Sequence, residues 1–265
     1  MLGGRLPSLT AMIVASARGG PGGPDPVAHR FFPPPLGRAI EVALRTARIG
    51  LVPHLVARTR AIDAAIREHP TPQLVVLGAG LDARAHRMEE LSKTTVFEID
   101  HPATQRYKRA RAGALPTAAR ELRYVPVDFE RDDLACSLDA AGHSPQEPTT
   151  WIWEGVTMYL TREAVDETLS AIARRSANGS ILLLTYVTPE LTVGSAFLRA
   201  VRPFVRPAFE VLGEPLRFTA TREEMAALAS AHGFTVMRDL DPPATVAERV
   251  LLAIRRASML SVPDG

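Results

Sequence analysis

The sequence has little cysteine, few aromatic residues and no long apolar run. Cys136 is the single cysteine among 265 residues, which excludes an intrachain disulfide framework and a metal site built from several thiolates. Phe, Trp and Tyr make up 6% of the chain, a low content for a protein that stacks nucleic-acid bases. No stretch approaches the roughly 18 apolar residues that a membrane span requires. We therefore expect neither a nucleic-acid partner nor a membrane segment.

A large excess of one charge is also absent. The 31 Lys and Arg residues nearly balance the 29 Asp and Glu residues, so nothing requires an anionic polymer as partner. No cluster of His, Asp and Glu has the spacing of metal ligands, and we expect no metal. The lone thiol favours a reducing, cytoplasmic location. Residues 6–17 end in small residues like a signal-peptide cleavage site, but Pro7, Ser8 and Thr10 interrupt the run.

The first 70 residues differ in pattern from the rest of the chain. Residues 21–35 are rich in proline and predict a loop that no regular element crosses. Apolar residues recur at helical spacing over residues 36–68, which predicts two helices broken near Pro53. We expect residues 1–70 to form a helical segment that covers the binding site of the following domain.

From residue 71 to residue 265, short apolar strands alternate with helices. The run 74–77 is apolar throughout, which is typical of a strand buried on both faces of a parallel sheet. Further strands are expected at 95–100, 122–127, 150–154, 180–186, 234–239 and 250–254, with helices after Pro102, over 162–177 and over 222–232. This alternation predicts an α/β fold with a doubly wound sheet, whose ligand binds at the carboxyl ends of the strands.

Residues 189–215 interrupt this alternation. They hold Phe197, Phe204 and Phe209 in an apolar stretch that two prolines break, and they are too long for a simple connection. We interpret them as an inserted cap over the strand ends. Packing on the domain surface or a contact between two copies of the chain is the alternative.

A glycine-rich motif follows the first strand. Gly78-Ala79-Gly80 begins a Gly-x-Gly-x-x-Ala pattern, where glycine permits a sharp turn and the close approach of a ligand. Asp100 ends the second strand about twenty residues later, where a carboxylate accepts hydrogen bonds from ribose hydroxyls. Together these features predict a nucleoside cofactor without saying which one.

Two later strand ends discriminate between cofactors. Asp128 and Phe129 follow the third strand and could hold an adenine by its amino group and its face. Glu154 ends the fourth strand, where its negative charge would attract the cationic S-adenosylmethionine and repel the pyrophosphate of a nicotinamide dinucleotide. The Tyr-x-x-x-Lys pair of short-chain dehydrogenases is absent from the sequence. These observations favour a methyl donor over NAD(P).

Four segments together resemble the leucine carboxyl methyltransferase superfamily: residues 73–87, 97–102, 127–129 and 153–160. The bacterial branch of this superfamily includes polyketide O-methyltransferases. The resemblance implies a Rossmann-like class I methyltransferase fold, with a mostly parallel seven-stranded sheet in the order 3-2-1-4-5-7-6 and an antiparallel last strand. It also implies S-adenosyl-L-methionine as the cofactor.

The resemblance further implies roles for individual residues. Gly78, Ala79 and Gly80 would line the methionine moiety, and Asp100 would bind the ribose. The adenine would lie against Asp128 and Phe129, and Glu154 would lie near the amino acid and the sulfonium.

An arginine that binds the cofactor carboxylate is expected on the helix before the first strand. Arg58 is the first choice for this role and Arg60 the second. Arg18, with Thr10 and Ala11, matches a segment that closes over the cofactor. The family's common Asp-Thr-Arg is here Asp82-Ala83-Arg84.

The acceptor is the least defined part of the prediction. We expect O-methylation of a small, hydrophobic, polyketide-like molecule at a carboxylate or a hydroxyl group. A carboxylate needs no general base, whereas a hydroxyl needs one, for which Tyr159, His29 and His101 are candidates. An NAD(P)-dependent oxidoreductase and a non-catalytic S-adenosylmethionine-binding protein are the alternatives. The sequence leaves the oligomeric state open.

Asp82, Arg84 and Arg87 are interpreted as a cap and ion pairs of the helix that follows the first strand, rather than as catalytic residues.

Overall fold

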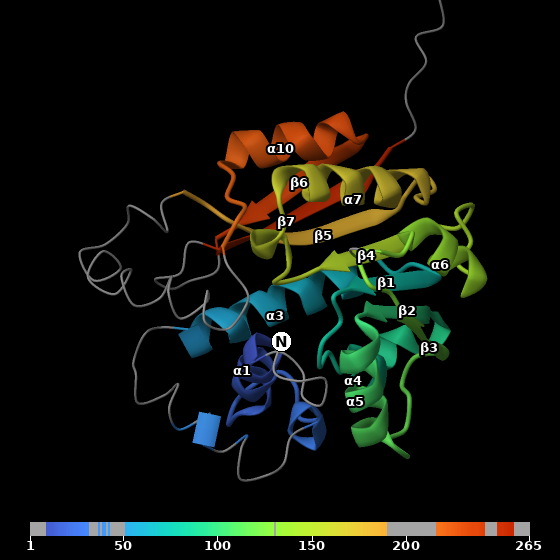
Figure 1. Ribbon diagram of the computed structural model, residues 1–265. Helices are drawn as coiled ribbons and strands as arrows, with labels where there is room; N and C mark the ends of the chain where they lie inside the picture. The colour runs from blue at the N-terminus through green and yellow to red at the C-terminus, as the bar shows by residue number, and fades with distance from the viewer. Residues whose placement is uncertain are drawn as a thin grey trace, which may run out of the picture.

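A seven-stranded sheet forms the centre of the molecule in the computed structural model, with helices on both faces (Figure 1). The structure describes residues 9–31, 37, 39–40, 42, 51–129, 131–189, 216–241 and 248–256. The strands are β1 (Gln73–Leu77), β2 (Thr95–Asp100), β3 (Glu121–Pro126), β4 (Thr149–Trp153), β5 (Ile181–Val187), β6 (Phe234–Leu240) and β7 (Glu248–Arg255). Their order is β3-β2-β1-β4-β5-β7-β6, as the resemblance implies. Strands β1 to β5 are parallel, and β7 is antiparallel to both β5 and β6.

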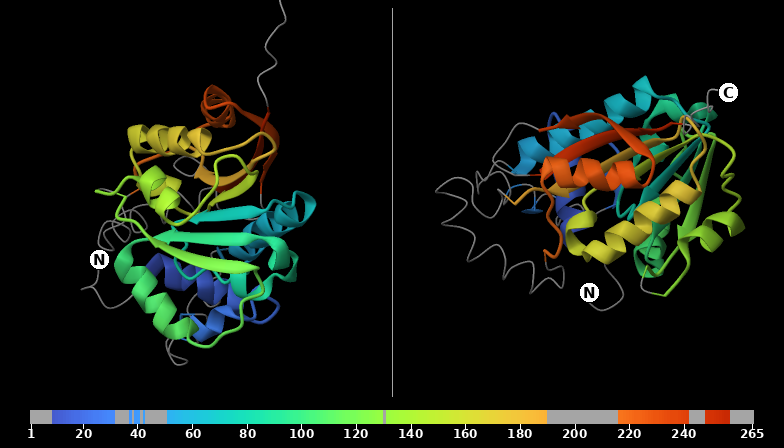
Figure 2. Two further views of the ribbon diagram at one scale, coloured as in Figure 1. Left: turned by 90° about the vertical axis from the view of Figure 1, so that its right-hand side faces the viewer. Right: turned by 90° about the horizontal axis from the view of Figure 1, so that it is seen from above.

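Two layers of helices enclose the sheet. The helices are α1 (Leu9–Gly19), α3 (Leu51–Glu68), α4 (Arg84–Arg87), α5 (Pro102–Ala112), α6 (Leu134–Ala140), α7 (Arg162–Arg174) and α10 (Arg222–Ala231). The described residues also form the short 3-10 turns η1 (Ala28–Phe31), η2 (Glu89–Lys93) and η3 (Thr157–Tyr159). Helices α6, α7 and α10 lie on one face of the sheet, and α1, α3, α4 and α5 lie on the other, as the left view of Figure 2 also shows.

Alternate residues of the central strands supply two separate cores. On the face of α7, Trp151 and Trp153 of β4 are almost fully buried among apolar residues of α6, α7 and α10. On the opposite face, Ile152 packs with Ile62 and Ile66 of α3. Both faces are thus covered, which explains why every residue of β1, β4 and β5 is buried rather than every second one.

Local sequence fixes where several helices begin. Thr221 and Glu224 form a capping box at the start of α10, each side chain accepting a hydrogen bond from the other residue's backbone N–H. Thr161 caps α7 through its hydroxyl. At α5, Pro102 takes the first position and the ring of His101 accepts from the Ala103 N–H at 3.2 Å. His101 therefore has a capping role in this structure.

Two predictions about the N-terminal part are wrong in detail. Pro53 does not break a helix, because α3 begins at Leu51 and holds the proline in its first turn, where no intrahelical N–H bond is lost. The loop predicted at 21–35 includes the turn η1, which buries Phe31. Most of residues 36–50, and the predicted cap with Phe197, Phe204 and Phe209, lie outside the described residues. Within the described part of the chain, no helix is long and apolar enough to cross a membrane.

Candidate functional site

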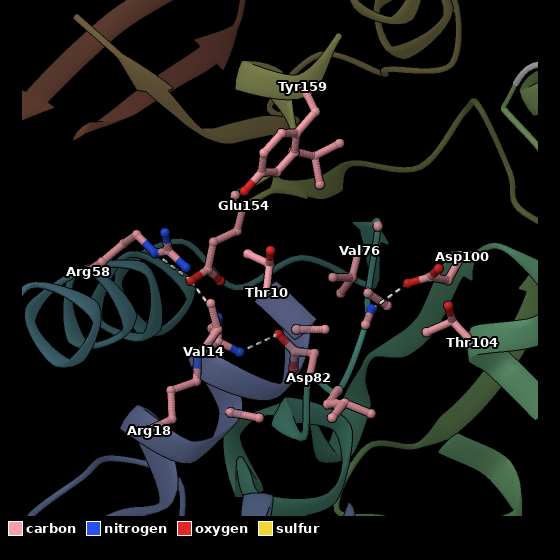
Figure 3. Close-up of a pocket in the computed structure, with 18 of the residues that line it drawn as sticks. Thr10, Val14, Arg18, Arg58, Val76, Asp82, Asp100, Thr104, Glu154 and Tyr159 are labelled. Carbon is pink, nitrogen blue, oxygen red and sulfur yellow. Dashed lines mark hydrogen bonds and ion pairs between the residues drawn. The ribbon is translucent and has the colours of Figure 1, made fainter. Parts of the chain in front are cut away.

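A cavity of about 370 Å³ opens at the carboxyl ends of β1, β2 and β4 (Figure 3). Its volume lies in the range of small-molecule sites. One wall is helix α1, from Thr10 to Arg18, so residues that precede the sheet by more than fifty positions complete the pocket. The lining comprises Thr10, Ala11, Val14, Ala15, Arg18, Arg58, Val76, Gly78, Ala79, Gly80, Leu81, Asp82, Asp100, Thr104, Glu154, Gly155, Val156, Tyr159 and Arg217.

The glycine motif forms the floor of this cavity. Gly78 and Gly80 have φ angles of 67° and 51°, a region that glycine adopts more readily than other residues. A Cβ atom on Gly78 would lie 2.6 Å from Val156 Cγ2, and one on Gly80 would lie 3.3 Å from the Cβ of Ala11. Glycine is therefore required both by the turn and by the close packing of α1 and of the segment after β4.

Asp100 stands at the edge of the cavity, at the end of β2. One carboxylate oxygen accepts a hydrogen bond from the Gly80 N–H, and the other accepts from the His101 N–H at 2.6 Å. Burial raises the pKa of Asp100, and these two N–H donors offset part of that effect. The carboxylate is thus held beside the glycine turn.

Glu154 is the centre of a buried ionic network, which we call the Glu154 network. Its carboxylate accepts hydrogen bonds from Arg18 Nη2 at 2.5 Å, from Arg58 Nε at 2.9 Å and from Arg84 Nη1 at 2.9 Å. Burial alone would raise the pKa of Glu154, but the three guanidinium groups outweigh it and hold this pKa well below its usual range. Figure 3 shows Arg18 and Arg58 converging on this carboxylate.

Further acids complete the Glu154 network. Arg84 binds Asp82 and also donates to Asp63 of α3 at 2.8 Å, and Arg87 Nη2 lies 2.7 Å from Asp63. Arg18 Nη1 lies 3.7 Å from Asp82. The side chains of Asp82, Arg84 and Arg87 therefore serve mainly in ion pairs. These pairs tie α1, α3 and the loop after β1 together around the cavity.

The charges around Glu154 differ from those expected from the sequence. From sequence, Glu154 is expected to face a cationic ligand, whereas the structure surrounds it with three cations of the chain itself. The pocket therefore offers both a carboxylate and guanidinium groups. Such a pair suits the ammonium and the carboxylate of an amino acid together.

The remaining predicted residues fall in two groups. Tyr159 lines the cavity. Arg58, the first choice for binding the cofactor carboxylate, also lines it. Arg60, the second choice, instead donates a hydrogen bond to the Gly22 carbonyl at 3.0 Å near the surface. Asp128 and Phe129 are not part of the lining, and the Phe129 side chain is 43% exposed. Their contact with an adenine stays a prediction.

His29 and His101 also lie outside the residues that line the cavity. No group of three or more His, Cys, Asp or Glu side chains in the described ranges could hold a metal ion.

Sequence reasoning missed Glu248, Asp63 and Arg217. Glu248 is buried at the start of β7 and binds Arg58. The strand was predicted to begin at Val250, because the apolar run begins there. The only sequence signal was a Glu-Arg pair directly before that run, which is equally typical of a solvated strand end. Arg217 lines the cavity from the segment before α10.

The residues that line the cavity have the chemical groups that S-adenosylmethionine needs. The glycine floor lets a ligand approach the backbone, Asp100 supplies a carboxylate for hydroxyl groups, and Arg58 and Glu154 supply opposite charges.

Comparisons with known proteins agree with this geometry. The family model of leucine carboxyl methyltransferase matches residues 24–173. A proposed S-adenosyl-L-methionine-dependent methyltransferase of Mycobacterium sp. (strain KMS) is 35% identical over 263 residues, covering 85% of this chain and 83% of the relative. One from Mycobacteroides abscessus is 34% identical, covering 73% of this chain and 68% of the relative.

Solved structures share the fold at low sequence identity. A proposed methyltransferase from Thermobifida fusca has a TM-score of 0.63 at 17% identity, with 97% of each chain covered. Human N-acetylserotonin methyltransferase in complex with S-adenosylmethionine has a TM-score of 0.55 at 15% identity, covering 93% of this chain and 65% of the human one. The nicotinamide alternative is not favoured by these findings. The chain belongs to the leucine carboxyl methyltransferase family, and it is a methyltransferase with S-adenosylmethionine as its cofactor.

Proposed function

We propose that the protein methylates an oxygen atom of a small, hydrophobic acceptor, a carboxylate or a hydroxyl of a polyketide-like molecule. The observation that carries the proposal is one cavity whose lining combines the glycine turn, charged residues of the Glu154 network and apolar residues such as Val156. The charged residues of the lining suit the cofactor, and the apolar residues after β4 suit the acceptor. We further propose a cytoplasmic location, in keeping with the exposed single thiol of Cys136.

In this proposal each end of the cofactor meets a different part of the lining. The turn at Gly78 and Gly80 would lie against the methionine half, and Asp100 would accept hydrogen bonds from the ribose hydroxyls. Arg58 and Arg18 would face the α-carboxylate, while Glu154 would face the α-ammonium group. Helix α1 covers this half of the cavity through Ala11, Val14 and Arg18.

The chain's own residues mainly orient the reactants and exclude water. Bound S-adenosylmethionine supplies a methyl group on a positively charged sulfur, which is already activated for transfer. The protein then has to hold the acceptor oxygen in line, at about 3–3.5 Å from the methyl carbon, in a site shielded from solvent. Helix α1 and the segment 154–159 provide that shielding where they border the cavity.

Tyr159 is the candidate that best fits a role toward the acceptor. It lines the cavity, whereas His29 and His101 do not, and the ring of His101 caps α5. A phenolic hydroxyl can orient an acceptor oxygen or accept its proton. A carboxylate acceptor would need only the orientation.

The first test is calorimetric titration with S-adenosylhomocysteine and, in parallel, with NADPH. We expect the wild-type protein to bind S-adenosylhomocysteine alone, and Asp100→Ala to weaken that binding about tenfold, as the loss of hydrogen bonds to a charged group would. Transfer is then measured with S-adenosylmethionine labelled in its methyl group and a panel of aromatic and aliphatic acids and phenols. Methyl products on nitrogen or carbon, or no product from any acceptor, would contradict O-methylation.

A further inference from the structure

The guanidinium group of Arg58 is held at two of its three nitrogens. Nε donates to Glu154 at 2.9 Å, and Nη1 donates to the two carboxylate oxygens of Glu248 at 2.8 and 2.7 Å. Among the described residues, none accepts a hydrogen bond from Nη2. Because Arg58 also lines the cavity, this third nitrogen is the donor left for a ligand.

Glu248 is a buried carboxylate that sits between Arg58 and a histidine. It is the first residue of β7 and pairs with Val187 at the end of β5. One of its oxygens lies 2.8 Å from His54 Nε2. Burial would raise the pKa of Glu248, but Arg58 and His54 lower it to about 2, so the residue is ionised at neutral pH.

His54 and Arg58 lie four residues apart on α3, hence on one face of the helix. Both side chains are buried. Glu248 therefore receives two donors from a single helix face and fixes that face against the end of β5. Without Glu248, Glu154 would be the remaining partner of Arg58 among the described residues. The guanidinium group could then rotate and direct any of its N–H groups to Glu154.

We infer that Glu248 and His54 are positioning residues that orient Arg58 for the α-carboxylate of the bound cofactor. The inference rests on the proposed binding mode and adds two residues to it that do not touch the ligand. An arginine that is ordered before binding loses less entropy when it forms a charge-assisted hydrogen bond. Glu248 and His54 would thus act on the amino-acid half of the cofactor and leave the nucleoside half unaffected.

Two probes separate these halves. S-adenosylhomocysteine carries the amino-acid group, and 5′-methylthioadenosine has the same adenine, ribose and thioether without it. We expect Glu248→Gln to weaken S-adenosylhomocysteine about tenfold in calorimetric titration and His54→Leu about threefold, as expected for a partly lost hydrogen bond to a charged group. Both variants should change the affinity for 5′-methylthioadenosine less than about twofold. Arg58→Gln should show the same selectivity with a larger loss.

Glu68→Gln is the matched control. Glu68 lies on the same helix and also joins it to a strand, through Arg238 of β6 at 2.6 Å, but both side chains are about half exposed. This variant should bind both probes like the wild type. Thermal unfolding of each variant establishes that it is folded, and His54→Leu provides the test if Glu248→Gln is not.

Each other outcome has a distinct meaning. Equal loss of both probes would show that Glu248 and His54 only support the fold, and unchanged S-adenosylhomocysteine affinity would show that Arg58 needs no positioning. Either result overturns the inference. If the wild type bound neither probe, the proposed function itself would fail, and the inference with it.

Discussion

Two buried ionic groups on the same side of the sheet behave differently. In the Glu154 network, one carboxylate meets three arginines, and its pKa is held well below the usual range despite burial. Glu98 of β2 is just as buried, but its ionic partner is Lys108 alone, at 2.5 Å, and its other oxygen is unpaired among the described residues. Burial raises the pKa of Glu98 to about 7, against the opposing effect of Lys108.

Burial raises the pKa of both carboxylates, so the number of cations around each accounts for the opposite directions of the two pKa shifts. Removing a charge from water costs several kcal/mol per ion, and one partner seldom offsets that cost. Asp82 and Asp100 raise the pKa of Glu98 further by repulsion. The Glu154 carboxylate thus has three arginines at the cavity, where the proposed function needs fixed charges, whereas Glu98 has one lysine.

The largest expected effect comes from removing the central acid of the network. Glu154→Gln would leave Arg18, Arg58 and Arg84 facing one another with too little negative charge, and should reduce the free energy of unfolding by about 3–5 kcal/mol. Urea denaturation at pH 7 measures this change. A loss below about 1 kcal/mol would mean that the three arginines find other partners. Glu154 would then not be the acid on which the stability of the network depends.

Removing the partner of Glu98 should cost less. In Lys108→Met, Glu98 can take up a proton instead of staying charged, so we expect a loss of about 1–3 kcal/mol at pH 7. The double variant with Glu98→Leu should recover most of that loss, because both buried polar groups are then absent. If the double variant were less stable than Lys108→Met, the Glu98 side chain would stabilise the fold through more than its ion pair with Lys108.

The two acids should also respond to pH with opposite signs. The pKa of Glu98 is higher in the folded protein, at about 7, than the ordinary value of 4.5, so wild type should lose stability relative to Glu98→Gln as pH rises from about 4.5 to about 7. We expect a relative loss of roughly 1–3 kcal/mol between pH 5 and pH 8. The lowered pKa of Glu154 predicts the reverse, stability that is lost as pH falls below its ordinary range. Denaturant curves at several pH values, with each Gln variant as reference, check both slopes.

The smallest effect is expected at an exposed pair. Glu68 and Arg238 form an ion pair with both side chains about half exposed, and solvent screens most of their attraction. Glu68→Gln should leave Tm unchanged within experimental error. A clear decrease in Tm would mean that this exposed ion pair stabilises the fold as the buried pairs do, despite its contact with solvent.

Most of the fold could be predicted from sequence because its signals are local. Runs such as 74–77 show strands buried on both faces, and Thr221 with Glu224 marks the start of a helix. The order of the strands came from the family resemblance. Pro53 was misread because a proline in the first turn of a helix and a proline at a break look alike when the preceding residues are also apolar at helical spacing.

The site was predictable where its residues follow strands. Gly78, Gly80, Asp100 and Glu154 all end or follow parallel strands, whose carboxyl ends must meet at one edge. The ionic network was not predictable, since Arg58 and Glu248 lie 190 residues apart and nothing local links them. Asp128 also follows a strand, but its loop turns on itself, with the Asp128 N–H donating to Asp132 at 2.8 Å, and β3 is two strands away from β1.

Because β7 runs antiparallel to β5, it begins at the edge of the sheet where the parallel strands end. In a sheet of parallel strands, each strand delivers to the ligand edge only the residues at which it ends. Strand β7 runs the other way, and its register aligns its first residue, Glu248, with Val187, the last residue of β5. The chain thus re-enters the sheet at the ligand edge, and the return strand brings a carboxylate there before it closes the fold. A parallel seventh strand would have left that residue at the opposite edge, out of reach of Arg58.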